Sequence, residues 1–382
     1  MPTLFVPKEI RAGERRVAAT PETVKKLVAA GFEVEIARAA GESAGLTDAA
    51  YEAVGARVVA GVDAAWRAAD VILKVQPPTD GEAELPKSGA LLLSLLDPYR
   101  NVELLKKLAG RGVAAFAMEM VPRTTRAQTM DVLSSQASIV GYKAVLLAAD
   151  RLGKYFPLLM TAAGTIQPAR VVVLGAGVAG LQALATAKRL GAIVEVSDVR
   201  PAVKQEVESL GGRFIDLPQM PSGEGQGGYA KELPAEFLAK QREILTARIA
   251  AADVVITTAQ VPGKKAPTLV TRAMVEAMKP GAVVVDIAAA QGGNCELTKA
   301  DEDVVHHHVT IVGPSNLAAS VAADASLLYA RNLLALLMLC VTKDKQVKLP
   351  EGDDIVDGTL VTRGGEIVHP AIAPLVAVPA GR

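Results

Sequence analysis

Short apolar runs alternate with helical patterns along most of the chain, and this alternation restricts the possible folds more than any other feature. Runs rich in Val, Ile and Leu occur at 3–6, 33–37, 56–60, 70–75, 90–96 and 113–119, and again at 169–175, 193–198, 212–217, 253–258, 282–287 and 309–313. Amphipathic stretches such as 21–31 and 102–112 separate them, and each closes at a glycine. Strands that alternate with helices in this way build parallel sheets through right-handed crossovers. The sequence therefore predicts an α/β protein with two doubly wound parallel-sheet domains.

Two long helical patterns, near 134–152 and 316–341, bracket the second series of strands. The six strands between them are enough for a complete dinucleotide-binding sheet. We therefore expect a Rossmann domain at 134–327 that is inserted into a discontinuous first domain, 1–133 plus 328–382, with a cleft between the two domains.

Composition narrows the class of protein. Lys plus Arg and Asp plus Glu number 41 each, and this zero balance gives no electrostatic footprint for nucleic acid. The two cysteines, Cys295 and Cys340, are too few for a disulfide framework, which fits a reducing cytoplasm. The charged N-terminus argues against an export signal. The apolar run 326–341 contains Arg331 and Asn332 and falls short of the roughly 20 apolar residues of a membrane span. We expect a buried helix there and no direct membrane insertion.

A dinucleotide-binding motif stands where a predicted strand ends and a helix begins. Its residues are Gly175, Ala176, Gly177, Val178, Ala179 and Gly180. In this motif Gly175 permits a tight turn, Gly177 lets the backbone approach a pyrophosphate, and Gly180 lets the helix pack on the strand. The amides at the start of the helix then hold the diphosphate.

The residue at the end of the next strand decides which dinucleotide fits. Asp198 lies there, 18 residues after the last glycine of the motif. Its carboxylate can bind both ribose hydroxyls and would repel a 2′-phosphate. Arg200 could accommodate that phosphate, but Asp198 carries its charge where the phosphate would have to lie. We predict NAD(H) as the cofactor of this chain, with Val199, Ala259 and Gln260 completing the site.

A glycine-rich segment, 216–233, follows the third strand of this series. Its composition predicts a mobile loop. Tyr229 is its sole aromatic residue, so the segment is either a plain flexible loop or an active-site lid that Tyr229 anchors.

Segments from nearly the whole chain share their motifs with one family. They are VPKEIRAGERRVAATPETVKKL (6–27), VILKVQPP (71–78), PRTTRAQTMDVLSSQASIVGYKAVLLAA (122–149), GAGVAG (175–180), SDVRPAVKQEVESLGG (197–212) and DIAAAQGGNCELT (286–298). They resemble the family of alanine dehydrogenase and the NAD(H)-binding component of proton-translocating transhydrogenase. Within it, the resemblance is greater to the transhydrogenase alpha subunit, in the form whose NAD(H)-binding component is a separate chain.

In that branch an Arg-Gln-Asp loop reaches over the nicotinamide, and the resemblance implies this role for Arg123, Gln128 and Asp131. Ser134 stands a turn later, and Tyr229 lies on the glycine-rich segment. The resemblance implies that Arg123 and Ser134 hold the carboxamide and that Asp131 orients Arg123. Gln128 would contact the incoming second nucleotide. An ordinary solvated helix start, with Asp131 near its N-terminus, is the alternative for this loop.

Alanine dehydrogenases use a Lys and a His beside the nicotinamide and an Arg for the substrate carboxylate. Lys74 and Arg16 match two of these positions, whereas Ser94 and its neighbours stand where a His-containing segment would be. Amine oxidation needs a general acid or base near neutral pH, but hydride transfer between two nicotinamides moves no proton. The missing His therefore favours the transhydrogenase branch. An alanine-type dehydrogenase and a non-catalytic NAD(H)-sensing subunit are the alternatives.

The resemblance also implies partners: an NADP(H)-binding subunit, membrane-spanning proton-translocating subunits and a second copy of this chain. The chain would then be cytoplasmic and attached peripherally to the inner membrane. We expect no metal site, because His306, His307 and His308 are adjacent and neighbours on a strand point to opposite faces. Asp286 and Asn294 flank a glycine-rich turn, where they either contact the nicotinamide or shape the turn.

Overall fold

Both series of predicted strands form sheets, one in each of two compact units. The computed structural model describes residues 1–217, 235–261 and 263–377. The first unit joins the N-terminal segment Met1–Gln136 to the C-terminal segment that begins at Ala319, and the second unit is Ala137–Ala318. Each unit contains a doubly wound sheet, so the predicted fold class is confirmed.

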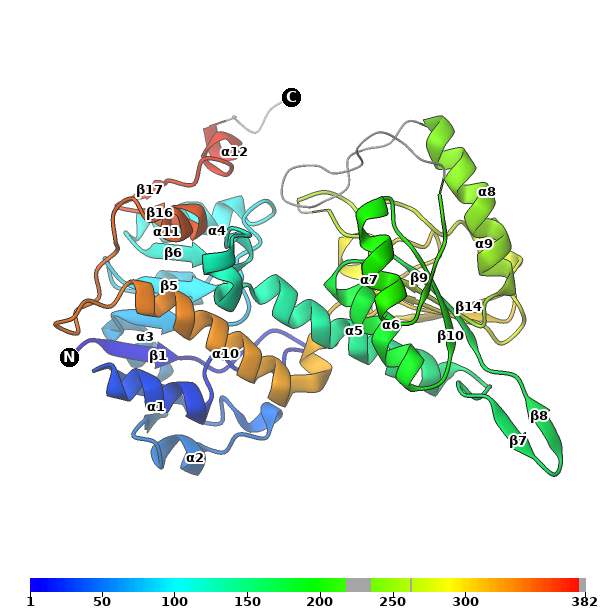
Figure 1. Ribbon diagram of the computed structural model, residues 1–382. Helices are drawn as coiled ribbons and strands as arrows, with labels where there is room; N and C mark the ends of the chain where they lie inside the picture. The colour runs from blue at the N-terminus through cyan, green and yellow to red at the C-terminus, as the bar shows by residue number, and fades with distance from the viewer. Residues whose placement is uncertain (218–234, 262, 378–382) are drawn as a thin grey trace. The chain divides into compact units, whose positions relative to one another are not determined.

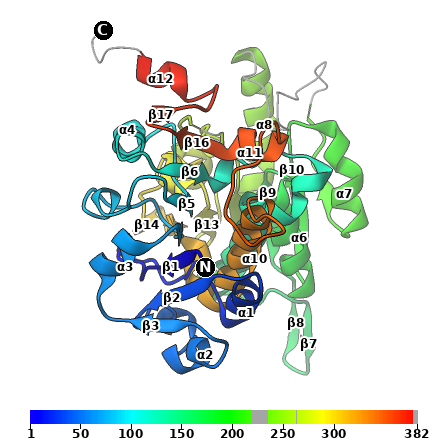
Figure 2. The same cartoon turned by 90° about the vertical axis from the view of Figure 1, so that its left-hand side faces the viewer.

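The sheet of the first unit has the strand order β17-β16-β6-β5-β4-β1-β2-β3. The strands are β1 (Thr3–Val6), β2 (Glu33–Ala37), β3 (Arg57–Val59), β4 (Val71–Leu73), β5 (Leu91–Ser94), β6 (Ala114–Ala117), β16 (Leu360–Arg363) and β17 (Glu366–Ile367). β1 to β6 are parallel, and the winding reverses between β1 and β4. β16 pairs antiparallel with β6 (Figure 2), and β17 extends that edge. These two antiparallel strands were not predicted from the sequence.

The helices of the first unit pack on this sheet around one core. They are α1 (Pro21–Ala29), α2 (Asp48–Glu52), α3 (Val62–Ala68), α4 (Val102–Gly110), α10 (Ala322–Leu339), α11 (Asp354–Thr359) and α12 (Ala373–Ala377). α1 begins as its sequence predicts, with Thr20 at the N-cap and Pro21 in the first turn. α11 begins at the N-cap Asp353, whose carboxylate accepts hydrogen bonds from two backbone amides of the helix. The sequence had indicated only turns in this part of the tail.

The sheet of the second unit has the order β11-β10-β9-β12-β13-β15-β14. Its strands are β9 (Arg170–Leu174), β10 (Ile193–Ser197), β11 (Arg213–Phe214), β12 (Val254–Thr257), β13 (Val283–Asp286), β14 (Asp303–His306) and β15 (Val309–Val312). All neighbours are parallel except β14, which joins β15 antiparallel at the edge. Without β14 this is the 3-2-1-4-5-6 order of dinucleotide-binding sheets, and its winding reverses between β9 and β12.

Helices cover both faces of this second sheet. They are α5 (Val132–Arg151), which begins in the first unit, and α6 (Val178–Arg189), α7 (Lys204–Ser209), α8 (Ala235–Ala251) and α9 (Arg272–Glu276). Alternate residues of β9 belong to different cores: Val171 and Val173 pack with α5, α6 and α7, whereas Val172 and Leu174 pack with α8 and α9. This two-sided burial explains the continuous apolar runs of the strands.

A hairpin that the sequence did not predict leaves this unit between α5 and β9. It consists of β7 (Leu159–Thr161) and β8 (Gly164–Ile166), which pair antiparallel. Figure 1 shows it projecting away from the large sheet of its unit. Met160 is 76% exposed and Ile166 39% exposed, because no other element of the described unit packs on the hairpin.

Two helical stretches, Val132–Arg151 and Leu317–Leu339, are long and apolar enough to cross a membrane by length and composition alone. The second stretch contains α10, whose Tyr329, Leu333 and Leu336 are fully buried in the core of the first unit. Packing of this kind is what the run 326–341 was predicted to show, and it is typical of a core helix.

Candidate functional site

The glycine motif lies at the carboxyl ends of β9 and β12, where the winding of the second sheet reverses. Gly175 follows β9 with φ of 107°, a left-handed conformation that favours glycine, and its amide donates to the carbonyl of Ser197 at 2.8 Å. Gly177 is the N-cap of α6, and a Cβ built on it would meet no atom within 4 Å. The loop therefore leaves open space at Gly177, the position expected to face a diphosphate.

Two further glycines hold the start of α6 close to its neighbours. A Cβ on Gly180 would overlap the carbonyl oxygen of Gly175, and a Cβ on Gly141 of α5 would overlap that of Ala179. Gly180 thus has the close-packing role that the motif predicts. The role of Gly141 was not predicted, although a glycine inside a helical pattern is a sequence signal for close approach.

Asp198 ties the end of β10 to the glycine loop. Its Oδ2 accepts a hydrogen bond from the amide of Ala176 at 2.7 Å. The same carboxylate accepts the backbone N–H, Nε and Nη2 of Arg200 at 2.9–3.0 Å. The structure therefore brings Asp198 and Arg200 together as an ion pair, with Val199 between them, beside the loop. The negative charge is held where the adenosine ribose lies in this class of site.

The far side of this edge is shaped by two buried polar residues. Asn294 binds the amide and carbonyl of Ala259 through its side chain. Asp286 accepts hydrogen bonds from Thr257, Thr298 and the amides of 288, 294 and 295. Both side chains are fully buried. Of the two roles considered for Asp286 and Asn294, the contacts show the shaping of the turn.

Gln260 follows Ala259 at the carboxyl end of β12, and its side chain donates to the carbonyl of Ile287 at 3.2 Å. Tyr229 and residues 218–233 of the predicted lid lie outside the described residues. Among the described residues, the glycine loop, Asp198 and Gln260 thus all stand at one edge of the second sheet.

The predicted nicotinamide loop forms a short 3₁₀ helix, η4 (Thr125–Met130), in the first unit. Arg123 and Gln128 are exposed. After η4, the carboxylate of Asp131 accepts both the amide and the hydroxyl of Ser134, at 2.9 and 2.6 Å. Asp131 and Ser134 are therefore brought together at the start of α5, and Gln128 projects from the preceding turn.

This loop is held by residues far away in the sequence. Asn332 of α10 donates to the carbonyl of Thr129 at 2.7 Å. Arg126 forms a two-pronged ion pair with Asp353, at 2.7 and 2.8 Å, and also contacts Asp354. Arg126 holds the pKa of Asp353 at about 2. The C-terminal tail thus fixes one end of η4, a contact that no local sequence pattern indicates.

The place in the first sheet that corresponds to the glycine loop contains ion pairs instead. It lies where the winding reverses between β1 and β4. Glu14 accepts the Nε and Nη2 of Arg16 at 2.8 and 2.7 Å, and the pKa of Glu14 is about 2 because these bonds outweigh its burial. Lys74 is fully buried and donates to Glu9 at 2.8 Å, with Glu82 at 3.4 Å. The two cations that match the dehydrogenase positions are each paired with a carboxylate of this chain.

Ser94 ends β5 beside this cluster. It is fully buried, and its hydroxyl donates to backbone carbonyls, including that of Gln76 at 2.9 Å. A serine bonded in this way offers no group that exchanges a proton near neutral pH. Glu119, which follows β6, accepts from the amides of Leu96 and Asp97, and burial raises the pKa of its carboxyl to about 7. Sequence reasoning did not identify Glu119.

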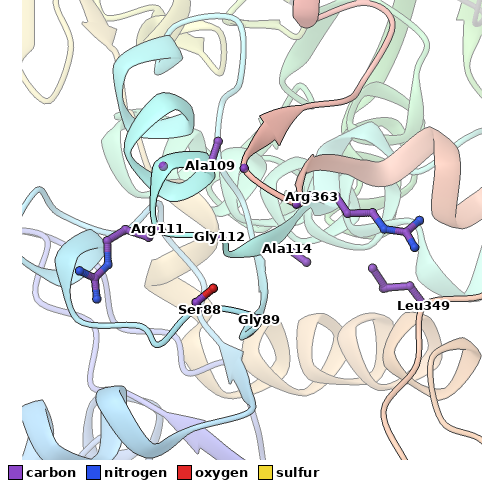
Figure 3. A pocket seen from close by; sticks show the side chains of 11 residues that line it. Ser88, Gly89, Ala109, Arg111, Gly112, Ala114, Leu349 and Arg363 are labelled. Carbon is purple, nitrogen blue, oxygen red and sulfur yellow. The ribbon is translucent and has the colours of Figure 1, made fainter.

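Two other features do not belong to this site. A hollow of about 850 Å³ in the first unit is lined in part by Arg111 and Arg363, but these side chains point away from each other (Figure 3). In the second unit, the expectation that the three adjacent histidines cannot converge is only partly right. β14 ends at His306, so His307 lies in a turn, and both approach Glu276.

Two family models match the chain. The model described as Alanine dehydrogenase/PNT, N-terminal domain, matches residues 5–140. The model described as Alanine dehydrogenase/PNT, C-terminal domain, matches residues 144–370.

Individual relatives divide into two groups by identity. The chain is 50% identical over 377 residues to the first of the chains that make up the NAD(P) transhydrogenase alpha subunit of Rhodospirillum rubrum, a match that covers 97% of this chain and 98% of that protein. It is 31% identical over 382 residues to alanine dehydrogenase of Halomonas elongata, a match that covers 97% and 95%. A crystal structure of transhydrogenase from Sinorhizobium meliloti superposes with a TM-score of 0.87 at 46% identity, covering 96% of this chain and 100% of that one. Similarity is thus greater to the transhydrogenases.

Proposed function

The chain belongs to the alanine dehydrogenase/PNT family, and from this we propose that it acts as the NAD(H)-binding alpha subunit of an NAD(P) transhydrogenase. It binds NADH and passes the hydride to NADP⁺ on a partner chain, which leaves NAD⁺ here and NADPH there. The observation that carries this proposal is the glycine loop beside Asp198, in a chain that matches the first chain of a divided transhydrogenase alpha subunit over nearly its full length.

The NAD(H) part of the proposal rests on the second unit. Its sheet has the dinucleotide-binding order, its loop leaves space at Gly177, and Asp198 holds negative charge beside the loop. A carboxylate there accepts ribose hydroxyls and repels a 2′-phosphate.

The second nucleotide belongs on another chain because the first unit offers no equivalent site. Its sheet reverses at the same place in the strand order, but the connection from β1 to α1 contains only Gly13 and carries the ion pair of Glu14 with Arg16. Hydride transfer needs donor and acceptor carbons roughly 3–3.5 Å apart. A partner must therefore bring its NADP(H) to the nicotinamide of this chain's NADH.

Residues of the first unit complete this proposal. Arg123 and Ser134 hold the nicotinamide carboxamide, Asp131 positions that loop, and Gln128 contacts the second nucleotide. The exposure of Gln128 and the hydrogen bonds between Asp131 and Ser134 support these roles. Tyr229 and the glycine-rich segment close over the bound cofactor.

The partners of the proposal are an NADP(H)-binding chain and membrane-spanning chains that couple the transfer to proton translocation. A homodimer of this chain, attached peripherally at the cytoplasmic face of the inner membrane through those partners, belongs to the same proposal. The similarity to one chain of a divided alpha subunit supports the need for other chains.

Reconstitution tests the function. We expect the purified chain to lack transhydrogenation by itself and to gain it when an NADP(H)-binding transhydrogenase subunit is added. Gln128→Asn should slow stopped-flow hydride transfer while NADH affinity stays nearly unchanged. Gln346→Asn makes the same exchange at an exposed position elsewhere in the first unit and serves as the control.

Three results would contradict this assignment in different ways. Rapid transhydrogenation by the chain alone would refute the need for a partner, and full-speed transfer by the Gln128 variant would refute its role. Steady oxidation of L-alanine with NAD⁺ would move the chain to the dehydrogenase branch, which the bonded hydroxyl of Ser94 argues against. NADH binding without any transfer in the complete complex would favour a sensing subunit.

A further inference from the structure

Three side chains that can bind a metal converge on the second unit, at a place that the hydride transfer does not use. Glu276 ends α9, His306 ends β14, and His307 begins the turn that leads to β15. One ligand atom from each lies within 4.8 Å of the other two. The Nε2 of His306 is 2.8 Å from a carboxylate oxygen of Glu276, and the imidazole rings of His306 and His307 have centroids 4.9 Å apart.

The backbone of the turn shows why two adjacent histidines can share one site. His307 and His308 have φ of 48° and 61°, both in the left-handed region. In a two-residue hairpin this conformation interrupts the alternation of the strand, so His307 is not forced to the face opposite His306. His308 is not one of the three converging residues.

The turn is also unusual in its residues. Two successive left-handed positions in a hairpin strongly favour Asn and Gly, and a side chain with a Cβ costs roughly 1–2 kcal/mol there. Strain of this kind in an exposed turn is an independent indication that the residue type has a use. Both residues here are imidazoles, which are common ligands of divalent transition metals.

The remaining contacts fix the ligands on separate elements. β14 is paired with β15, with His306 opposite Val309, and the amide of Gly281 donates to the carbonyl of His308 at 2.8 Å. The hydrogen bond from His306 holds the pKa of Glu276 below its usual range, so the carboxylate is ionised as a ligand must be.

We propose that Glu276, His306 and His307 form a binding site for a divalent transition-metal ion, with Zn²⁺ as the ion that best fits one carboxylate and two imidazoles. Zn²⁺ is bound tetrahedrally by such ligands, and three protein ligands leave the fourth position to water. The site lies where β15 begins, at the sheet edge opposite the glycine loop. The ion therefore joins α9 to the β14–β15 turn and stabilises the second unit without contacting the nicotinamide.

Titration of the untagged, chelator-treated chain with Zn²⁺ tests the proposal, with Co²⁺ as a spectroscopic probe of tetrahedral geometry. We expect about one Zn²⁺ per chain and tetrahedral cobalt absorption that Zn²⁺ displaces. At Zn²⁺ concentrations about 100-fold above Kd, the unfolding midpoint of the second unit should rise by roughly 5–10 °C. NADH affinity should not change.

The adjacent histidines supply a matched pair of variants. Asn tolerates the left-handed conformation of both positions, so His307→Asn and His308→Asn change the backbone equally little. His307→Asn and Glu276→Gln should weaken Zn²⁺ binding at least tenfold, whereas His308→Asn should leave it unchanged. Melting curves without metal show whether each variant is folded. Absence of saturable binding to the wild-type chain, or equal losses in the two Asn variants, would overturn the proposal.

Discussion

Removing the carboxylate of Asp198 is the most direct test of cofactor choice, because this group has two separable tasks. It anchors the glycine loop through the amide of Ala176 and forms the ion pair with Arg200. In the NADH complex it would also accept the ribose hydroxyls. Asp198→Ala removes all of these contacts. Asp198→Asn keeps an acceptor for the loop amide but removes the charge.

The size of the effect follows from these contacts. A hydrogen bond to a charged group contributes about 1.5–3 kcal/mol, so Asp198→Ala should weaken NADH binding about 10- to 150-fold. NADPH should lose less or gain, because the charge that repels its 2′-phosphate is gone and the guanidinium of Arg200 can turn toward that phosphate. Asp198→Asn should narrow the preference for NADH with a smaller loss of NADH affinity, since the loop stays anchored.

Calorimetric titration of the purified chain with NADH and NADPH measures both affinities. Glu195→Gln removes the same charge from the same strand, at a residue that pairs with Arg248, and serves as the control. Equal wild-type affinities for NADH and NADPH would refute the reasoning. So would an Asp198→Ala variant whose ratio of NADH to NADPH affinity stays within about threefold of the wild-type ratio.

Three further predictions follow from packing and charge. Gly180→Ala should destabilise the second unit by about 1–3 kcal/mol in chemical denaturation, because its Cβ overlaps a loop carbonyl, whereas Gly177→Ala should leave stability unchanged and weaken NADH binding by blocking the diphosphate. Burial raises the pKa of Glu119 to about 7, so the folded protein keeps a proton that the unfolded chain loses above about pH 4.5. Stability should therefore fall by up to about 3 kcal/mol as pH rises from 4.5 to 7, and Glu119→Gln should flatten this dependence; an unchanged slope would contradict the assignment. Asp353→Asn keeps the cap of α11 but removes the ion pair with Arg126, so hydrogen exchange across η4 should quicken while global stability changes by less than about 1 kcal/mol; unaltered exchange would show that the tail does not hold the loop.

Features encoded locally could be predicted from the sequence. All twelve predicted strands exist, because a buried parallel strand is a short run of β-branched and aliphatic residues between helical patterns. The glycine motif was placed correctly at a strand end and helix start because its spacing reflects the conformation of a few consecutive residues. Asp198 could be found by its distance from that motif, since one crossover separates them.

Elements with weak local patterns were missed. β16 forms because Leu360 and Thr362 can pair with β6, more than 240 residues earlier in the chain, and the tail had suggested only turns. β14 was overlooked because it is a short edge strand of mixed polarity, whose pattern is not apolar. Such strands depend on a partner edge that is available only in the folded sheet.

The sequence by itself determined the two doubly wound sheets, the cofactor loop and the charge beside it, since each depends on residues close together in the chain. Only the tertiary structure decided which polar residues meet. It joined Arg126 to Asp353, set Gly141 against Ala179, and brought His307 to Glu276. These partners lie tens to hundreds of residues apart, and no local periodicity encodes them. They are selected by the order of strands and the packing of helices, which bring distant side chains within hydrogen-bonding distance.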